Sequence, residues 1–189
     1  KHLFASLAVL LAANFAYAQP LVLKKGDRIS IVGNTLAERM QHHGWLETYL
    51  LTRFSDRDLA FRNLGFSGDE LTTRLRSAGF GSPDDWLAKT KTDVVFAFFG
   101  YNESFAGKAG LPKFRTDLEA FIKHTVAQKY NGKTATRLVV FSPIAHEDHH
   151  AKNFPDGKAN HTRLELYNAP MSVVAKPNAP WMQHHELPF

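Results

Sequence analysis

The stretch "VVFAFFGYNESF", residues 94–105, runs six apolar residues into Gly100 and then presents Asn102. An apolar run without polar interruption is typical of a strand buried on both faces, as in a parallel sheet covered by helices. A glycine directly after the run lets the backbone turn sharply. The stretch therefore predicts an inner strand whose carboxyl end carries a polar asparagine.

Similar apolar runs alternate with amphipathic segments along most of the chain. Strands are expected at 28–34, 59–68, 92–100 and 136–144, and helices at 35–54, 69–79 and 112–130. This order predicts an α/β fold, a three-layer α/β/α sandwich with a parallel sheet of the flavodoxin-like type. A further helix at 160–167 is expected to be broken by the prolines that follow it, Pro170, Pro177 and Pro180.

Composition excludes several classes of site. The 189 residues are 44% hydrophobic and 22% charged, which is typical of one globular domain. Since cysteine is absent, disulfides, thiolate metal sites and cysteine nucleophiles are excluded. The formal charge of +5 is scattered along the chain, so no nucleic-acid partner is expected. No cofactor is expected either.

The first residues read as a signal peptide. A basic start, an apolar run over 3–13, and small residues at Ala16 and Ala18 predict cleavage before Gln19. A membrane anchor or a buried helix is the alternative, but the run is shorter than the ~20 residues that a span needs. We expect residues 1–18 to direct export to a secreted or periplasmic location, without stable membrane insertion after cleavage, and residues 19–189 to form the domain.

Polar or turn-forming residues follow each expected strand. Thr35, Gly68 and Asn102 are 33 and 34 positions apart, about the length of one βαβ unit, and residues 143–146 follow the fourth strand. Ligands bind at the carboxyl ends of such strands. The edge of the sheet formed by these carboxyl ends is called the rim below. A hydroxyl, a backbone N–H and a side-chain amide at the rim suit acyl transfer, in which an oxygen attacks a carbonyl and hydrogen-bond donors stabilise the oxyanion.

Three segments carry a family resemblance. "ISIVGNT", "NLGFSGDEL" and "FAFFGYNES" resemble, in order and spacing, the first three blocks of the SGNH or GDSL-type esterases and lipases. The resemblance implies that Gly68 and Asn102 are oxyanion donors and that Thr35 stands at the nucleophile position. The longer flanking segments are similar to GDSL-like proteins of planctomycete-type bacteria.

The chain departs from the family pattern at the nucleophile. Gly33, Asn34 and Thr35 replace Gly-Asp-Ser, and the methyl group of threonine restricts χ1 and crowds the approach to an ester. Thr35 also suits the N-cap of the helix that follows. Asn102 and Gly68 have a similar alternative, since both residue types are common in tight turns. Glu103 suits a helix cap.

The second departure concerns the acid and the base. The family's last block carries Asp-x-x-His, which is missing after Ile144, so the domain is expected to be incomplete at its C-terminus. Trp181 and Met182 stand where the aspartate would precede His184 and His185.

His146 is a weak substitute base, because it follows the fourth strand. Histidines and acids in such a loop are also typical of solvent-facing turns, so no metal site is expected there, and His42 and His43 are expected on a helix surface.

Two functions follow from these expectations. The first is an exported hydrolase of carboxylic esters, an acetyl or carbohydrate esterase, in which Thr35 or an activated water attacks. The alternative is a catalytically inactive module of the same fold that binds a glycan or another polar ligand. A flavodoxin-like phosphate-binding domain is disfavoured, because the chain has no glycine-rich phosphate loop of the recognised spacing. Both functions imply a small-molecule or carbohydrate partner.

Overall fold

The computed structural model describes residues 21–147, 150, 152–154 and 157–178. The expected signal peptide, Pro180 and the tail with His184 and His185 lie outside this range. No helix in the described part of the chain combines the length and the apolar character needed to span a membrane.

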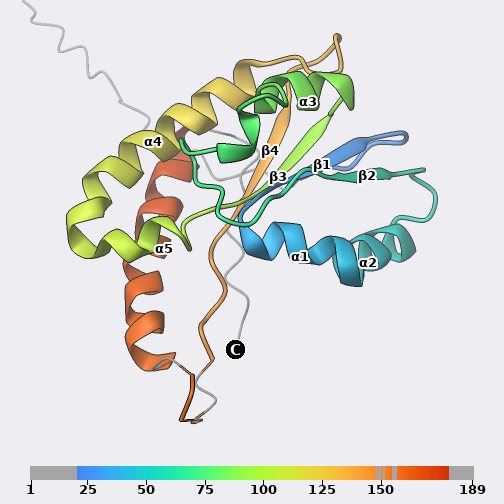
Figure 1. The fold of residues 1–189 in the computed structure, drawn as a ribbon. Coiled ribbons are helices and arrows are strands. Elements are labelled where there is room, and N and C mark those ends of the chain that lie inside the picture. The colour runs from blue at the N-terminus through green and yellow to red at the C-terminus, as the bar shows by residue number, and fades with distance from the viewer. Residues whose placement is uncertain (1–20, 148–149, 151, 155–156, 179–189) are drawn as a thin grey trace, which may run out of the picture.

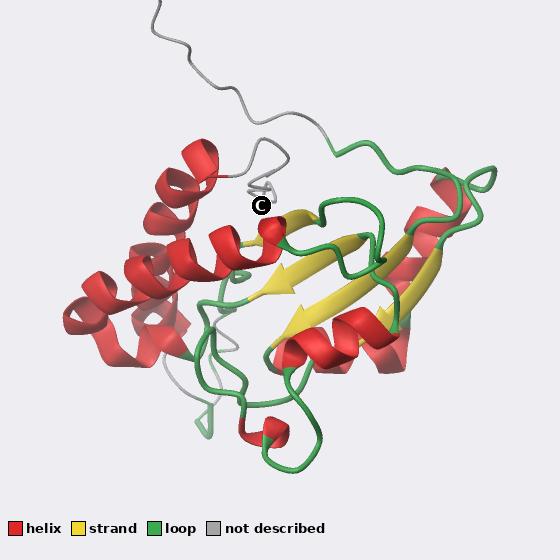
Figure 2. Ribbon diagram, turned by 90° about the horizontal axis from the view of Figure 1, so that it is seen from above, coloured by secondary structure: helices red, strands yellow, loops and turns green. Residues whose placement is uncertain are grey.

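Four parallel strands form the sheet, in the order β2-β1-β3-β4 (Figure 1). They are β1 (Arg28–Gly33), β2 (Ala60–Asn63), β3 (Val94–Phe98) and β4 (Arg137–Phe141). All five residues of β3 are buried, as its uninterrupted apolar sequence predicts. Figure 2 shows the strands side by side with helices around them, and a buried apolar cluster lies on each face of the sheet. The predicted α/β/α architecture is confirmed.

One face of the sheet is covered by α1 (Thr35–His43) and α2 (Trp45–Arg53). Ala37, Met40 and Leu50 pack there against the apolar side chains of β1 and β3. The expectation of a single helix over 35–54 is wrong at Gly44, which ends α1 and begins α2 with a left-handed φ of 60°. Glycine adopts this conformation without the steric penalty of a side chain.

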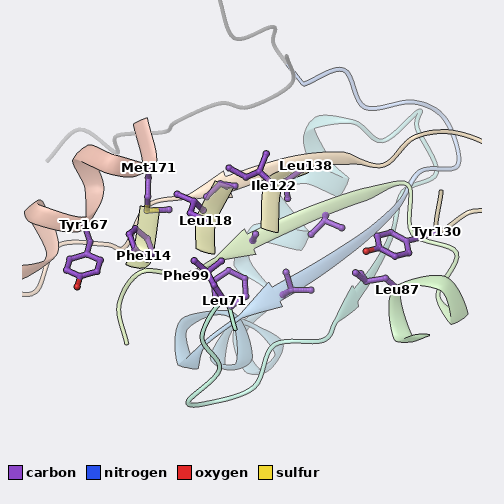
Figure 3. Packing of buried hydrophobic residues seen from close by; sticks show 14 residues of the cluster. Leu71, Leu87, Phe99, Phe114, Leu118, Ile122, Tyr130, Leu138, Tyr167 and Met171 are labelled. Carbon is purple, nitrogen blue, oxygen red and sulfur yellow. The ribbon is translucent and has the colours of Figure 1, made fainter. Parts of the chain in front are cut away.

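The other face carries α3 (Pro83–Lys89), α4 (Gly107–Ala127) and α5 (Gly157–Asn178). Figure 3 shows the buried side chains on this face, among them Phe114 and Leu118 of α4 beside Tyr167 and Met171 of α5. The hydroxyl of Tyr167 donates to the Gly107 carbonyl 2.9 Å away, which fixes α5 against the start of α4.

Two helices do not end or begin where their prolines predicted. Helix α5 continues through Pro170 and Pro177, so the expected break after residue 167 is wrong. Helix α4 begins five residues before Pro112, the expected start. Since Tyr167 and Met171 are both fully buried against α4, we infer that this burial offsets the hydrogen bond lost at Pro170.

The helix expected at 69–79 does not form. The segment is a loop with one 3-10 turn, η1 (Leu75–Ser77), and the helix begins later, at Pro83. Leu71 is buried but Leu75 is exposed, so the apolar pair that favoured a helix does not share a buried face. A capping box at Ser82 and Asp85 sets the start of α3, with each residue bonding the backbone N–H of the other.

Candidate functional site

The carboxyl ends of β1 and β3 approach each other closely at Gly33. A Cβ atom on Gly33 would lie 2.2 Å from the carbonyl oxygen of Phe98, and the φ of Gly33 is 140°. The N–H of Asn34 donates to the same oxygen at 3.2 Å, and the N–H of Phe66 donates to the Gly33 carbonyl at 3.0 Å. The chain segments that leave β1, β2 and β3 therefore meet at one rim, next to the point where strand order reverses and open parallel sheets bind ligands.

Thr35 is the first residue of α1 and is exposed. The side chain of Asn34 is the N-cap, since its oxygen accepts from the N–H of Leu36 at 3.3 Å. The alternative role of Thr35 as N-cap is therefore wrong. No described residue forms a hydrogen bond with the Thr35 hydroxyl, so geometry leaves this group available at the rim.

Gly68 is the third residue of a β-turn, in which the N–H of Asp69 donates to the Phe66 carbonyl at 3.1 Å. Its φ of 89° explains why glycine is suited to this position. The Ser67 hydroxyl donates to Glu38 of α1 at 2.6 Å, which holds the turn near the start of that helix. Gly68 is exposed and its N–H donates to no backbone oxygen in the described residues, so it is free to bind a ligand oxygen.

Asn102 lies beside this turn. Its side-chain Nδ2 donates to the backbone carbonyl of Asp69 at 3.5 Å, a long hydrogen bond that a ligand can replace. Asn102 is half-buried and precedes the 3-10 turn η2 (Glu103–Ala106). The structure thus brings the Gly68 turn and Asn102 together across 33 positions of sequence.

Glu103 joins the same two loops, a role that the sequence did not reveal. Its carboxylate accepts from the N–H of Leu71 at 2.9 Å and from the N–H of Gly100 at 2.8 Å. Burial raises the pKa of Glu103, and the N–H groups that it accepts from offset this rise only in part. In the sequence, Glu103 suited a helix cap, and the signal for the observed role was an acid directly after Asn102.

His146 lies on the loop that follows β4. Its Nε2 is 3.4 Å from Nδ2 of Asn160 on α5, and the described residues show no hydrogen bond between His146 and Thr35. The loop does reach the rim, because a Cβ on Gly100 would lie 3.1 Å from Cγ of Pro143. No group of three or more metal-ligating side chains gathers anywhere in the described residues.

No family model and no curated protein matches this chain in sequence. Its structure resembles that of a gut microbial diltiazem-metabolizing enzyme, with a TM-score of 0.66 and 18% identity over 89% of this chain. The chain spans only 38% of the length of that enzyme.

Two further solved structures are similar over most of the chain. An acetyl xylan esterase from Geobacillus stearothermophilus has a TM-score of 0.54 and 12% identity, over 82% of this chain and 76% of its own. A GDSL-like lipase from Parabacteroides merdae has a TM-score of 0.55 and 17% identity, over 84% of this chain and 78% of its own.

Catalytic mutants of the Geobacillus enzyme replace a serine, an aspartate and a histidine, the last two three positions apart. In the present sequence no aspartate precedes a histidine by three positions. The likeness therefore defines the architecture and leaves the chemistry open: this chain has the SGNH/GDSL-like fold of these esterases and lipases.

Proposed function

We propose that this protein hydrolyses carboxylic esters, with the Gly68 N–H and the Asn102 side-chain amide binding the oxyanion. The contact between Asn102 and the backbone of Asp69 carries this proposal, because it gathers both donors at the rim where Thr35 begins α1. Donors held in place before reaction stabilise the negative oxygen without reorganisation.

The reaction needs an oxygen nucleophile at the acyl carbon. The Thr35 hydroxyl, or a water molecule next to it, adds to the carbonyl carbon and its proton passes to a base. The carbonyl oxygen becomes the oxyanion bound by Gly68 and Asn102, and when the carbonyl re-forms the base returns the proton to the departing alkoxide, which leaves as the alcohol. If water attacked, the product is the free acid; if Thr35 attacked, the product is an acyl-Thr35 ester, which a water molecule then hydrolyses by the same addition and collapse to release the acid and restore the hydroxyl. His146 is the candidate base, and it would have to turn away from Asn160 to act.

We also propose a location outside the cytoplasm and a class of ester substrate. A signal peptide over residues 1–18 would export the protein, and an acetyl group on a carbohydrate is the substrate class that fits the esterase-like neighbours. The resemblance of the flanking segments to planctomycete-type GDSL-like proteins stays a prediction from the sequence.

A second function, binding a glycan or another polar ligand without turnover, is favoured by one observation. No described histidine forms a hydrogen bond with Thr35, so the usual activation of a hydroxyl by a neighbouring base is not assembled there. In that case the rim would hold its ligand through the same donors.

Initial rates with p-nitrophenyl acetate test the first function. Asn102→Ala should lower kcat by roughly 10²-fold, the scale of losing one oxyanion donor. Asn153→Ala, an exposed asparagine after β4, is the matched control and should keep the wild-type rate. A protein that cleaves no short-chain ester, or that is indifferent to Asn102→Ala, would refute the hydrolytic proposal.

A further inference from the structure

Arg163 on α5 is a half-buried arginine that has no carboxylate partner among the described residues. Each of the other half-buried arginines in the described range lies within 3.7 Å of a carboxylate, in the pairs Arg57–Asp56, Arg74–Asp69 and Arg137–Asp27. A charge that is partly removed from water is costly unless an opposite charge or hydrogen bonds compensate it. Arg163 therefore carries a positive charge that no described acid balances.

Most hydrogen-bond donors of Arg163 are unused. A guanidinium group has five N–H bonds that can donate. In the described part of the chain Arg163 makes one hydrogen bond, from Nη2 to Oδ1 of Asn160. Its Nε is buried and finds no acceptor there. Since a buried donor without an acceptor is costly, a ligand oxygen bound to this group would recover free energy without displacing an existing contact.

Two aromatic rings hold the guanidinium in place. The Cζ atom of Arg163 lies 4.4 Å from the centroid of the Phe105 ring, and Phe105 packs edge-to-face on Tyr101 with centroids 5.6 Å apart. An arginine that stacks on a ring keeps the N–H groups at its edge available for an acceptor. Phe105 is 60% exposed, so the stack lies at the surface, where a ligand can reach it.

The stack lies beside the candidate catalytic groups. The N–H of Phe105 donates to the Asn102 carbonyl at 3.2 Å, so this ring belongs to the turn that carries a candidate oxyanion donor. Asn160, which accepts from Arg163, is 3.4 Å from Nε2 of His146, the candidate base. One residue thus separates Arg163 from each of these two groups.

The acids nearest to this stack along the chain are engaged elsewhere. Glu165 lies 3.3 Å from Nε2 of His161, and the Glu103 carboxylate accepts from two backbone N–H groups. The counter-ion of Arg163 is therefore free to come from a ligand. A carboxylate suits it, because its two oxygens match the planar fork of a guanidinium.

We propose that Arg163 binds a carboxylate on the substrate, so that the protein prefers small esters that carry a negative charge. The inference rests on the proposed hydrolysis at the rim, for which it names a residue that determines specificity. Arg163 takes no part in the bonds that form and break. It holds the charged end of the ester while the carbonyl lies at the candidate oxyanion donors.

Two pairs of esters test the proposal, one with the charge on the alcohol side and one with it on the acyl side. They are p-acetoxybenzoate with p-acetoxybenzamide, and p-nitrophenyl hydrogen adipate with p-nitrophenyl hexanoate. In Arg163→Gln, the ratio of kcat/KM for the anionic ester to that for the neutral ester should fall roughly 10-fold in at least one pair, the scale of a hydrogen bond to a charged group. A purely structural loss would lower both rates of a pair alike. Arg115→Gln, at an exposed arginine on α4, is the matched control and should keep the wild-type ratio.

Binding without turnover is measured on the ¹⁵N-labelled full chain. Sodium benzoate should shift the Nε–H resonance of Arg163, assigned with Arg163→Gln, with a dissociation constant on the order of 1 mM. Benzamide and sodium chloride at the same concentration should not shift it. Phe105→Ala removes an exposed ring, so it should weaken benzoate binding in a folded protein even if Arg163→Gln fails to fold.

The outcomes separate this inference from the proposed function. The inference is overturned if Arg163→Gln keeps the wild-type ratio in both pairs, if benzoate gives no shift, or if benzamide or chloride shifts the resonance as strongly as benzoate. Ester hydrolysis would still stand in these cases, because the neutral esters report on it. Benzoate binding at Arg163 in a protein that cleaves no ester would support the carboxylate site and refute hydrolysis.

Discussion

The Glu103 carboxylate accepts a hydrogen bond from the backbone N–H of Leu71, which lies 32 positions earlier in the chain. This bond ties the loop after β2 to the loop after β3. Because Gly68 lies on the first loop and Asn102 on the second, this carboxylate helps to set the spacing of the two candidate oxyanion donors, together with the hydrogen bond from Asn102 to the Asp69 carbonyl.

Replacing Glu103 by Gln should destabilise the fold. One of the two amide atoms of glutamine is a donor, so it would face a backbone N–H that then lacks an acceptor. Leaving a buried donor unsatisfied costs about 1–3 kcal/mol in the free energy of unfolding. Urea denaturation measures this cost. Glu119→Gln, at an exposed pair with Lys123 on α4, is the control and should change stability by less than about 0.5 kcal/mol. Equal effects of both variants would contradict the role assigned to Glu103.

Comparison of the wild type with Glu103→Gln also tests how the free energy of unfolding depends on pH. Burial raises the pKa of Glu103 in the folded state above the value of about 4.3 for an unfolded chain, so the native protein binds the extra proton. Stability from this group is present below the unfolded pKa and is lost as pH rises through the folded pKa. The free energy of unfolding of wild type minus that of Glu103→Gln should therefore fall as the pH rises above the unfolded pKa of about 4.3. Urea denaturation as a function of pH checks it, and a difference that rises with pH would show that the hydrogen bonds outweigh burial.

Gly33→Ala should be severely destabilising. Its Cβ would lie 2.2 Å from the Phe98 carbonyl oxygen, so the ends of β1 and β3 would have to separate. We expect a loss of more than about 3 kcal/mol, from backbone strain and from the clash. Gly26→Ala is the matched control, because φ is also positive there and no atom lies within 4 Å of the added Cβ. It should cost only about 1–2 kcal/mol by urea denaturation. Similar losses for the two variants would mean that the close approach to Phe98 is not limiting.

Thr35→Ser tests whether this hydroxyl attacks the substrate. Serine removes the methyl group that restricts χ1, so kcat for p-nitrophenyl acetate should rise by about 10-fold, equivalent to 1.4 kcal/mol of barrier. Stability should change little, since Thr35 is exposed. Thr116→Ser, an exposed threonine on α4, is the control. If Thr35→Ser and Thr35→Ala both keep the wild-type rate, the attacking oxygen belongs to water.

Tyr167→Phe tests how α5 is held. The variant loses the hydrogen bond from the Tyr167 hydroxyl to the Gly107 carbonyl but keeps the buried ring. The expected cost is about 1 kcal/mol in the free energy of unfolding, measured by urea denaturation. Tyr49→Phe, at an exposed position of α2, should be neutral. A neutral Tyr167→Phe would indicate that ring packing alone fixes α5.

The positions of the candidate site residues in the fold could be predicted from the sequence, because apolar runs show where the strands end. Thr35, Gly68 and Asn102 each follow an apolar run, and parallel strands bring such positions to one rim. The sequence could not show that Asn34 would cap α1 in place of Thr35, since both residue types suit a cap. Nor could it show that His146 would contact Asn160 on α5, because that contact depends on how a long loop and a distant helix pack.

The sequence by itself determined the layered fold, since the apolar runs of β1, β3 and β4 can only be satisfied by burial on both faces of a sheet. Tertiary contacts determined that the segment 69–79 forms a loop and that α5 continues through its prolines. In the first, bonds from Leu71 to Glu103 and the stacking of Arg74 on Phe99 replace a helix that local periodicity favoured. In the second, burial of Tyr167 and Met171 outweighs the proline signals. Local patterns report only neighbours along the chain, whereas these contacts join segments that meet only after folding.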